Sequence, residues 1–291
     1  SDEALVHPNR PREADEEDYA LCFAVPMNAP GLTILCRDLY AEHADQERLP
    51  LTARFDEVDA TLIFDDVLVP WDRVFVYRNP ALASQFHRSL TRLDGGFTTA
   101  VRLLAKLEAF VGVADLLSQW AGRERDRAVQ VQIGQLIADV EVLRACLHTA
   151  EAEAQVLPNG FMAHRMSSAY RLHGIEASDR AERLLEDILT SSLVLTGGAS
   201  DLASPEIGPL VERYFRNNAP STRDHLRLLA VAADMVQSAF AARTQLYERL
   251  QSGEPANMRA RLYAGAPVRA AAAARLLRFI REEWIPPESP A

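Results

Sequence analysis

One short segment combines residue types that could bind a cofactor: Leu195–Asp201, with the sequence LTGGASD. It follows a stretch with helical periodicity. We expect the next helix to begin at Ser204, with this serine as the N-cap and Pro205 in the first turn. Gly197 and Gly198 would leave backbone N–H groups uncovered, so a flat heterocycle or a phosphate could approach them closely. The same spacing also fits an ordinary helix–helix connection, which on spacing alone is the commoner case.

Other catalytic patterns find little support in the chain. The seven histidines form neither HExxH nor a repeated ExxH pair, so zinc-protease and di-iron sites are not indicated. GxSxG, Walker A and GxGxxG motifs are missing, which argues against α/β-hydrolases, P-loop enzymes and ordinary Rossmann domains. We therefore predict no metal site, and no catalytic residue can be assigned from these patterns.

Composition limits the class of protein further. The chain has 291 residues, of which 48% are hydrophobic, so it can form a sizeable core. The net charge of -10 and the pI near 5.3 argue against a nucleic-acid partner. The three cysteines lie far apart, which favours reduced thiols and a cytoplasmic location. The most apolar stretch, Val268–Ile280, is interrupted by arginines, so we expect no membrane span.

The first 80 or so residues contain short apolar runs that are typical of β-strands. Three regions of strand character are Tyr19–Pro26, Leu32–Cys36 and Val58–Val69. Turn chemistry at Asn28–Gly31 separates the first two regions, and Asp65-Asp66 is expected to form a turn or bulge within the third. This part of the chain is therefore predicted to be a small β-domain or a piece of one.

From about Gly95 onward the periodicity becomes helical, with Pro158-Asn159-Gly160 expected to separate the second and third helices. The third helix is expected to cover Ser167–Leu195, and the last one Ala256–Glu282. Strands followed by long helices with short links indicate an α+β protein with an antiparallel bundle. The apolar positions that carry the other three helices are Val101, Leu104, Leu107, Val111 and Ala114, then Ile133, Leu136, Val140, Leu143 and Leu147, then Leu226, Leu229, Ala233, Val236 and Phe240.

Six separated blocks of the chain together resemble the sequence of a known family. The blocks are Tyr19–Leu21 with Val25–Gly31, Phe55–Ala60, Phe64–Phe75, Ala203–Ile207, Glu212–Tyr214 and Leu246–Arg249. They resemble, in the right order from about Asp18 to Leu262, the two-component, FADH2-dependent aromatic hydroxylases of the 4-hydroxyphenylacetate 3-monooxygenase type.

The resemblance implies an acyl-CoA-dehydrogenase-like fold. Residues 1–85 would form the carboxy-terminal part of a middle β-domain, and residues 86–291 a helical bundle for flavin binding and oligomerisation. It also implies a homotetramer or dimer, and that the family's amino-terminal helical domain lies outside this sequence.

The resemblance further implies an oxygenase component that takes FADH2 from a separate flavin reductase. With O2 it would hydroxylate a phenolic substrate ortho to the hydroxyl through a flavin C4a-hydroperoxide. Gln132 and Gly134 would contact the cofactor from a neighbouring subunit, and Arg102 with Lys106 would lie near its adenosine-diphosphate part; a solvated helix face is the simpler interpretation of that pair. The resemblance places the flavin-contacting loop at Thr196, Gly197, Gly198, Ala199, Ser200 and Asp201.

The family takes its catalytic arginine, tyrosine and histidine chiefly from the amino-terminal domain, so this chain matches none of them. We therefore expect these 291 residues alone to bind FAD weakly and to hydroxylate no phenol. Two alternatives stay open. One is a flavin dehydrogenase or dehydratase of the same fold, for which Glu206 is the candidate base, although its position suits a helix start better. The other is a scaffold without catalysis.

Overall fold

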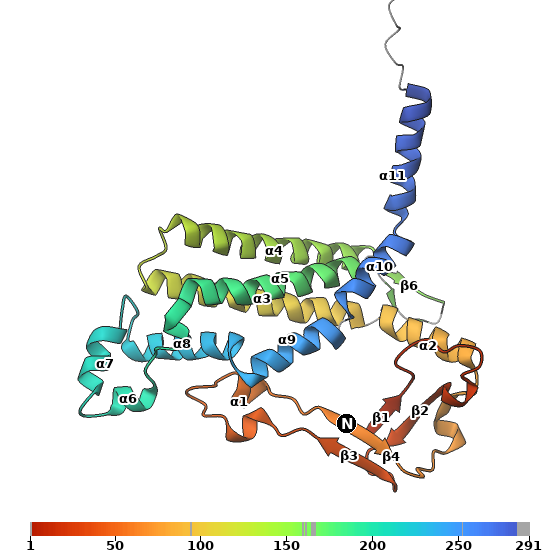
Figure 1. Ribbon diagram of the computed structural model, residues 1–291, viewed down its shortest axis with the longest axis horizontal. Coiled ribbons are helices and arrows are strands. Elements are labelled where there is room, and N and C mark those ends of the chain that lie inside the picture. Colours follow the sequence, from red (N-terminus) through yellow and green to blue (C-terminus); the bar gives the residue numbers. More distant parts are fainter. Residues whose placement is uncertain are drawn as a thin grey trace, which may run out of the picture.

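The computed structural model describes residues 2–93, 95–158, 160, 162–163, 167–251 and 253–283. Strands and short helical turns from the first 77 residues lie on one side, and long helices from the rest of the chain lie on the other (Figure 1). The expected order of strands followed by helices is therefore confirmed. No helix within these ranges is long and apolar enough to cross a membrane.

The strands of the first 77 residues form two small antiparallel sheets, one with the order β1-β2-β5 and one pairing β3 with β4. The three predicted strand regions correspond to β2, β3 and β4, but β4 ends before Val67–Val69, because the chain turns at Asp66 with φ 52°. The strands are β1 Glu3–Val6, β2 Leu21–Pro26, β3 Leu32–Cys36, β4 Ala60–Phe64 and β5 Val74–Tyr77. The short helices between them are η1 Glu17–Tyr19, η2 Tyr40–His43, α1 Thr52–Phe55 and η3 Trp71–Arg73.

Gly31 closes the predicted turn before β3. Its φ of 82° lies in the left-handed region, and a Cβ built there would lie 2.3 Å from the carbonyl oxygen of Asp65. The Asp65 N–H in turn donates to the Gly31 carbonyl at 3.0 Å. Only glycine meets both requirements, so the turn residue sets where β3 and β4 begin to pair.

Three long helices form the main core, α3 (Gly95–Trp120), α4 (Arg127–Ala152) and α5 (Ser167–Leu189), with α2 (Pro80–Leu93) leading into them. The apolar positions predicted for α4 are confirmed as its buried face, or seam, since Leu136, Val140, Leu143 and Leu147 are buried and Ile133 packs beside them. On α3 the predicted seam is shifted in its first half, where Val101 is 45% exposed. The apolar residues buried on α3 are Ala100, Leu103, Leu107, Phe110, Val113, Ala114 and Leu117.

The link between α4 and α5 contains a small hairpin, β6 (Gln155–Val156) with β7 (Met162–Ala163). Gly160 has φ 85°, as expected for a turn, and Asn159 lies outside the described residues. The predicted third helix is too long, because α5 ends at Leu189 and η4 (Thr190–Leu193) follows with Thr190 at φ 49°.

Two further helix predictions are wrong at proline or serine positions. The predicted fourth helix stops at Val236, and Phe240 belongs to the next helix, which Ser238 caps by accepting from the Ala241 N–H at 2.9 Å. The predicted final helix is broken before Pro267, which cannot continue the helical hydrogen bonds. The remaining elements are α6 Ala199–Ala203, α7 Gly208–Phe215, α8 Thr222–Val236, α9 Ala239–Gln251, α10 Pro255–Gly265, α11 Pro267–Arg278 and the π-helical turn Phe279–Glu283.

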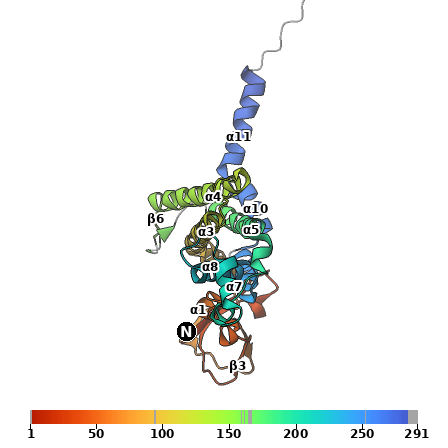
Figure 2. The same cartoon turned by 90° about the vertical axis from the view of Figure 1, so that its left-hand side faces the viewer.

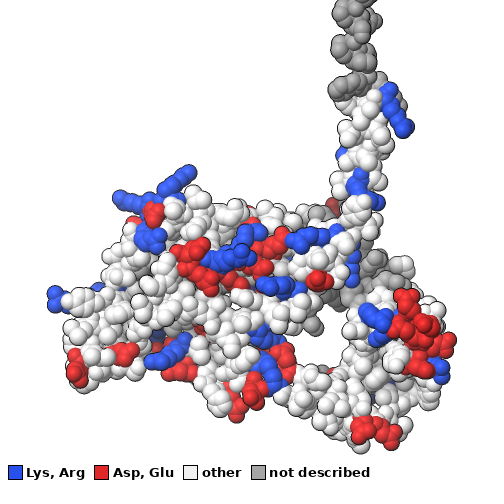
Figure 3. Space-filling view, in the orientation of Figure 1, with Lys and Arg blue, Asp and Glu red and all other residues white. Residues whose placement is uncertain are grey.

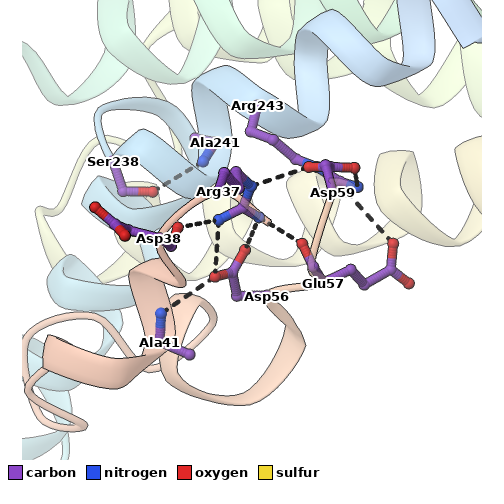
Figure 4. A network of polar contacts seen from close by, with 9 residues as sticks. All are labelled: Arg37, Asp38, Ala41, Asp56, Glu57, Asp59, Ser238, Ala241 and Arg243. Carbon is purple, nitrogen blue, oxygen red and sulfur yellow. Dashed lines mark hydrogen bonds and ion pairs between the residues drawn. The ribbon is translucent and has the colours of Figure 1, made fainter. Parts of the chain in front are cut away.

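The strand region and the bundle are joined by charged side chains. Arg243 on α9 donates to both carboxylate oxygens of Asp59, at 2.6 and 2.9 Å, and Arg37 donates to Asp59 and Asp56 (Figure 4). The two arginines, Arg243 foremost, hold the pKa of Asp59 well below its usual range. Figure 3 shows an opening between the bundle and the strand region, so these parts do not meet along their whole length.

Candidate functional site

The glycine segment lines a pocket at the end of the bundle where α6 and α7 lie (Figure 1). The pocket volume of about 210 Å³ is below the usual range for a whole cofactor, about 300–1,000 Å³, so it can enclose only part of a large ligand. Its walls come from the glycine segment, from a segment before α1 and from α8. The lining residues are Glu47, Arg48, Thr196, Gly197, Gly198, Ala199, Leu202, Arg223, Leu226, Arg227, Ala230 and Ala233.

The glycine segment is a short link followed by a helix. Thr196 and Gly197 have no regular secondary structure and Gly198 is extended, whereas Ala199, Ser200 and Asp201 form the first turn of α6 and not a loop. The Gly198 N–H donates to Asp201 Oδ2 at 2.7 Å, so the aspartate caps this turn. That amide is consequently unavailable to a ligand, contrary to the expectation that both glycines leave their N–H groups uncovered.

Neither glycine of this segment is required by the backbone. Gly198 has φ -105°, which any residue adopts, and a Cβ on Gly198 would lie 3.5 Å from the Arg48 guanidinium, an ordinary contact. A Cβ on Gly197 would lie 3.6 Å from Asp201 Oδ2. The two glycines leave this part of the pocket lining without side chains, so a flat group can approach the backbone closely.

Arginine side chains dominate the charge of the pocket. Arg227 donates to Glu47 at 3.1 Å, and this hydrogen bond is the main cause that lowers the Glu47 pKa. Within the described part of the chain, neither Arg48 nor Arg223 takes part in an ion pair. Three guanidinium groups with one carboxylate leave an excess of positive charge, which suits a phosphate or carboxylate.

The helix that follows the glycine segment begins later than predicted. Ser204 accepts from the N–H groups of Glu206 and Ile207, at 3.3 and 3.4 Å, but these residues form a turn and α7 starts at Gly208. A Cβ on Gly208 would meet the Leu202 carbonyl oxygen at 2.6 Å, so glycine permits the close approach of α6 and α7. The Glu206 side chain is exposed and is absent from the pocket lining.

The predicted pair on α3 lies away from this pocket. Arg102 is exposed and stacks over the ring of Tyr247, 5.2 Å from its centroid, while Arg243 lies 4.9 Å from the same centroid. Lys106 is partly buried and donates to Glu182 at 2.9 Å and Glu248 at 2.8 Å. A solvated helix face therefore describes Arg102 but not Lys106, whose charge is used inside the bundle.

Gln132 and Gly134 lie elsewhere again, on α4. Gly134 lines a shallow hollow of about 200 Å³ between α3 and α4, together with Ser118, Val129 and Ile133. The predicted residues thus fall in three separate places of a single chain. The resemblance assigned Gln132 to a contact made from a neighbouring subunit, and this separation is compatible with that arrangement.

Sequence patterns missed the charged wall of the pocket. On α8, Arg223, Arg227 and Ala230 follow one another at helical spacing on one face, and this spacing is the sequence signal that indicates a shared wall. Arg48 has no such signal, because its segment is irregular and meets Gly198 only in the folded chain. No group of three or more potential metal ligands occurs among the residues that the structure describes.

Comparison with known proteins assigns the chain to the 4-hydroxyphenylacetate 3-hydroxylase family. Residues 83–277 match the family model described as 4-hydroxyphenylacetate 3-hydroxylase C terminal, and residues 1–76 match the one described as 4-hydroxyphenylacetate 3-hydroxylase N terminal. The chain is 34% identical over 267 residues to the 4-hydroxyphenylacetate 3-monooxygenase oxygenase component of Thermus thermophilus, covering 90% of this chain and 55% of that protein. It is 33% identical to the pyoverdin chromophore biosynthetic protein PvcC of Pseudomonas aeruginosa, covering 84% and 50%.

Solved structures agree with these matches. The oxygenase component (HpaB) of 4-hydroxyphenylacetate 3-monooxygenase complexed with FAD superimposes with a TM-score of 0.89 at 32% identity, over 97% of this chain and 59% of that one. An archaeal 4-hydroxybutyryl-CoA dehydratase from N. maritimus shares the fold, with a TM-score of 0.81 at 18% identity over 100% of this chain and 59% of that one. The expected α+β, acyl-CoA-dehydrogenase-like fold is confirmed. The chain spans about half the length of the curated relatives it matches.

Proposed function

Because the chain belongs to the 4-hydroxyphenylacetate 3-hydroxylase family, we propose that the complete protein is the oxygenase component of a two-component flavin-dependent aromatic monooxygenase. It would take reduced FAD from a separate flavin reductase, use O2, and hydroxylate a phenolic substrate ortho to its hydroxyl group. The flavin supplies the activation of oxygen when it is bound. The three free cysteines support a reducing, cytoplasmic location.

The observation that carries this proposal is the pocket itself. It offers bare backbone at Gly197 and Gly198 beside the Arg48 guanidinium, and α8 contributes Arg223 and Arg227 to the same pocket. FAD joins a flat ring system to a diphosphate with two negative charges, so these residues fit one portion of it. The proposed cofactor contacts in this segment are Thr196, Gly197, Gly198, Ala199, Ser200 and Asp201.

The rest of the cofactor would lie outside this pocket, which is too small to enclose it. Arg102, Gln132 and Gly134 are the further proposed contacts, with Gln132 and Gly134 reaching the flavin of a neighbouring subunit. Residues 1–85 and 86–291 are proposed as two units, a β-domain part and a bundle. The change from β5, which ends at Tyr77, to α2, which begins at Pro80, supports a division near this point.

The proposed dimer or tetramer is supported by α11, which projects away from the body of the protein (Figures 1 and 2). All its side chains are exposed. Apolar residues on it and on the turn that follows include Val268, Leu276, Leu277 and Ile280, each 49% exposed or more. A projecting apolar helix is costly in water, and a second copy of the chain would cover it.

The chemistry of hydroxylation sets what this chain has to do. A phenol with a pKa near 10 reacts as phenolate, so a base or cation must stand beside it. The described residues of the pocket contribute cations but no candidate base other than Glu47, which Arg227 already binds. This chain is therefore proposed to bind and orient the flavin and to exclude water from it.

The test is carried out on the complete protein with a flavin reductase and a panel of phenols. We expect retention of reduced FAD and formation of a catechol. Arg48→Gln should weaken FAD binding about tenfold, the usual consequence of losing one charge-assisted contact. Arg54→Gln, which removes an exposed arginine from the same segment, should leave binding unchanged. No FAD uptake at roughly tens of micromolar would support the scaffold alternative.

A further inference from the structure

Asp234, near the carboxyl end of α8, is fully buried and binds the beginning of α1 with both carboxylate oxygens. Its Oδ2 accepts from the Leu51 N–H at 2.7 Å and from the Thr52 N–H at 2.8 Å, and its Oδ1 accepts from the Thr52 hydroxyl at 2.5 Å. Thr52 is itself only 2% exposed. A buried carboxylate is tolerated only when donors surround it, and here the strand side of the molecule supplies three.

The residues that Asp234 binds belong to a compact segment that also carries Arg48. The Asp45 side chain accepts from the Glu47 N–H at 2.8 Å, and the Asp45 carbonyl accepts from the N–H groups of Arg48 and Leu49. The Leu49 carbonyl then accepts from the Ala53 N–H at 3.0 Å. Consecutive turns therefore connect Arg48 rigidly to the anchored residues 51 and 52.

A second contact joins this segment to α8, but it is much more exposed. The ion pair between Glu47 and Arg227 has exposed fractions of 41% and 55%, and pairs of this kind contribute little. The buried Asp234 contact is consequently the one that fixes the segment. Ala233, the neighbour of Asp234, lies in the pocket wall, so the anchor and the pocket share one turn of α8.

We propose that Asp234 is a positioning residue, which holds residues 45–55 on α8 so that Arg48 faces the pocket beside Gly198. Asp234 touches no pocket ligand itself. Its effect on the cofactor passes through Arg48, and in this respect the inference rests on the proposed function. A carboxylate of the bundle, that of Asp234, thus positions a cation of the strand region, Arg48, at the pocket.

The test compares variants of the complete protein by hydrogen exchange and by FAD titration. In Asp234→Ala we expect the amides of residues 45–55 to exchange about tenfold faster or more, because their buried acceptor is lost. The FAD dissociation constant should rise about tenfold. Asp234→Asn should cause smaller increases in the exchange rates and in the FAD dissociation constant than Asp234→Ala does, since its side-chain carbonyl can still accept from the two N–H groups. Asp139→Asn, at an equally buried aspartate paired with Arg180, should change neither measurement.

Combining Asp234→Ala with Arg48→Gln distinguishes an effect that passes through Arg48 from a general destabilisation of the protein. If Asp234 acts through Arg48, then Asp234→Ala adds little to the loss of FAD affinity already present in Arg48→Gln. Fully additive losses would overturn the proposal, and so would unchanged exchange of residues 45–55 in Asp234→Ala. The proposed function fails by a different result, a wild-type protein that takes up no FAD. In that case the exchange comparison still decides whether Asp234 is the anchor.

Discussion

A lysine shared by two carboxylates connects three helices of the bundle. Lys106 on α3 lies 2.9 Å from Glu182 Oε1 on α5 and 2.8 Å from Glu248 Oε2 on α9. The three side chains are only 17%, 9% and 14% exposed, and the Ser178 hydroxyl donates to the Glu248 carboxylate at 3.3 Å. Replacing the lysine by methionine keeps the length of the chain but removes the only charge that balances the two carboxylates within this cluster.

We expect Lys106→Met to lower the free energy of unfolding at pH 7 by about 3–5 kcal/mol, the usual cost of leaving a buried charge without its partner. Burial already raises the pKa of Glu182 in the wild type, although Lys106 opposes that shift. Without the lysine this pKa should rise further. A carboxyl group whose pKa is higher in the folded state stabilises the fold below its unfolded pKa, and that contribution is lost as the pH rises through the folded pKa. The difference in the free energy of unfolding between Lys106→Met and the wild type should therefore become smaller as the pH falls from 8 to 5.

Urea unfolding at several pH values tests both statements, with Arg144→Met as the matched control. Arg144 also contacts two carboxylates, those of Glu108 and Glu141, but its side chain is 40% exposed. Water screens such a pair, so the control should unfold almost as the wild type does. A deficit in Lys106→Met no larger than that of the control would refute the reasoning, as would a large deficit that does not vary between pH 5 and 8.

Further variants test single features of the fold. Gly31→Ala should lower the free energy of unfolding by at least about 1 kcal/mol, because of the positive φ and the nearby Asp65 carbonyl; Gly112→Ala, with nothing within 4 Å of its Cβ, should be neutral or stabilising in the same urea titration. Arg243→Met should destabilise more at pH 7 than at pH 3, because Asp59, whose pKa this arginine lowers, contributes its full stabilisation above its unfolded pKa and loses part of it as the pH falls below that value; thermal unfolding at the two pH values would show the difference. Asp126→Ala removes the side chain that caps α4 through the Ala128 N–H at 2.9 Å, and circular dichroism should record a lower Tm for it than for Asp115→Ala on the surface of α3.

Local sequence signals predicted the elements whose boundaries depend on neighbouring residues. The strand β3 follows directly from Leu32–Cys36, and the seam of α4 follows from its heptad spacing, because each pattern lies within a few residues. The strand β1 was missed, since Glu3–Val6 is a strand only through its pairing with β2. Two of the wrong helix ends had readable signals, namely Pro267 and the capping serine Ser238, which the continuing apolar periodicity concealed.

Only the part of the candidate site that one continuous segment of the chain forms could be predicted from the sequence. Thr196, Gly197, Gly198 and Ala199 do line the pocket, as the glycine pattern indicated. Arg48 was not predicted, because nothing in the residues around it indicates that it meets Gly198, about 150 positions later. Lys106 was placed at a cofactor on resemblance alone, and its two carboxylate partners come from helices whose packing no local pattern specifies.

The pocket has a consequence for how the two parts of the chain depend on each other. Helices of the bundle alone would retain the glycine segment with Arg223 and Arg227, but they would lack Arg48 and Glu47. Asp234 would then lose the three donors that Leu51 and Thr52 provide, and water would have to replace them. Docking of the strand region therefore completes the cationic wall and, in the same step, buries the Asp234 carboxylate with its donors in place. Assembly of the pocket and folding of this junction are therefore one event.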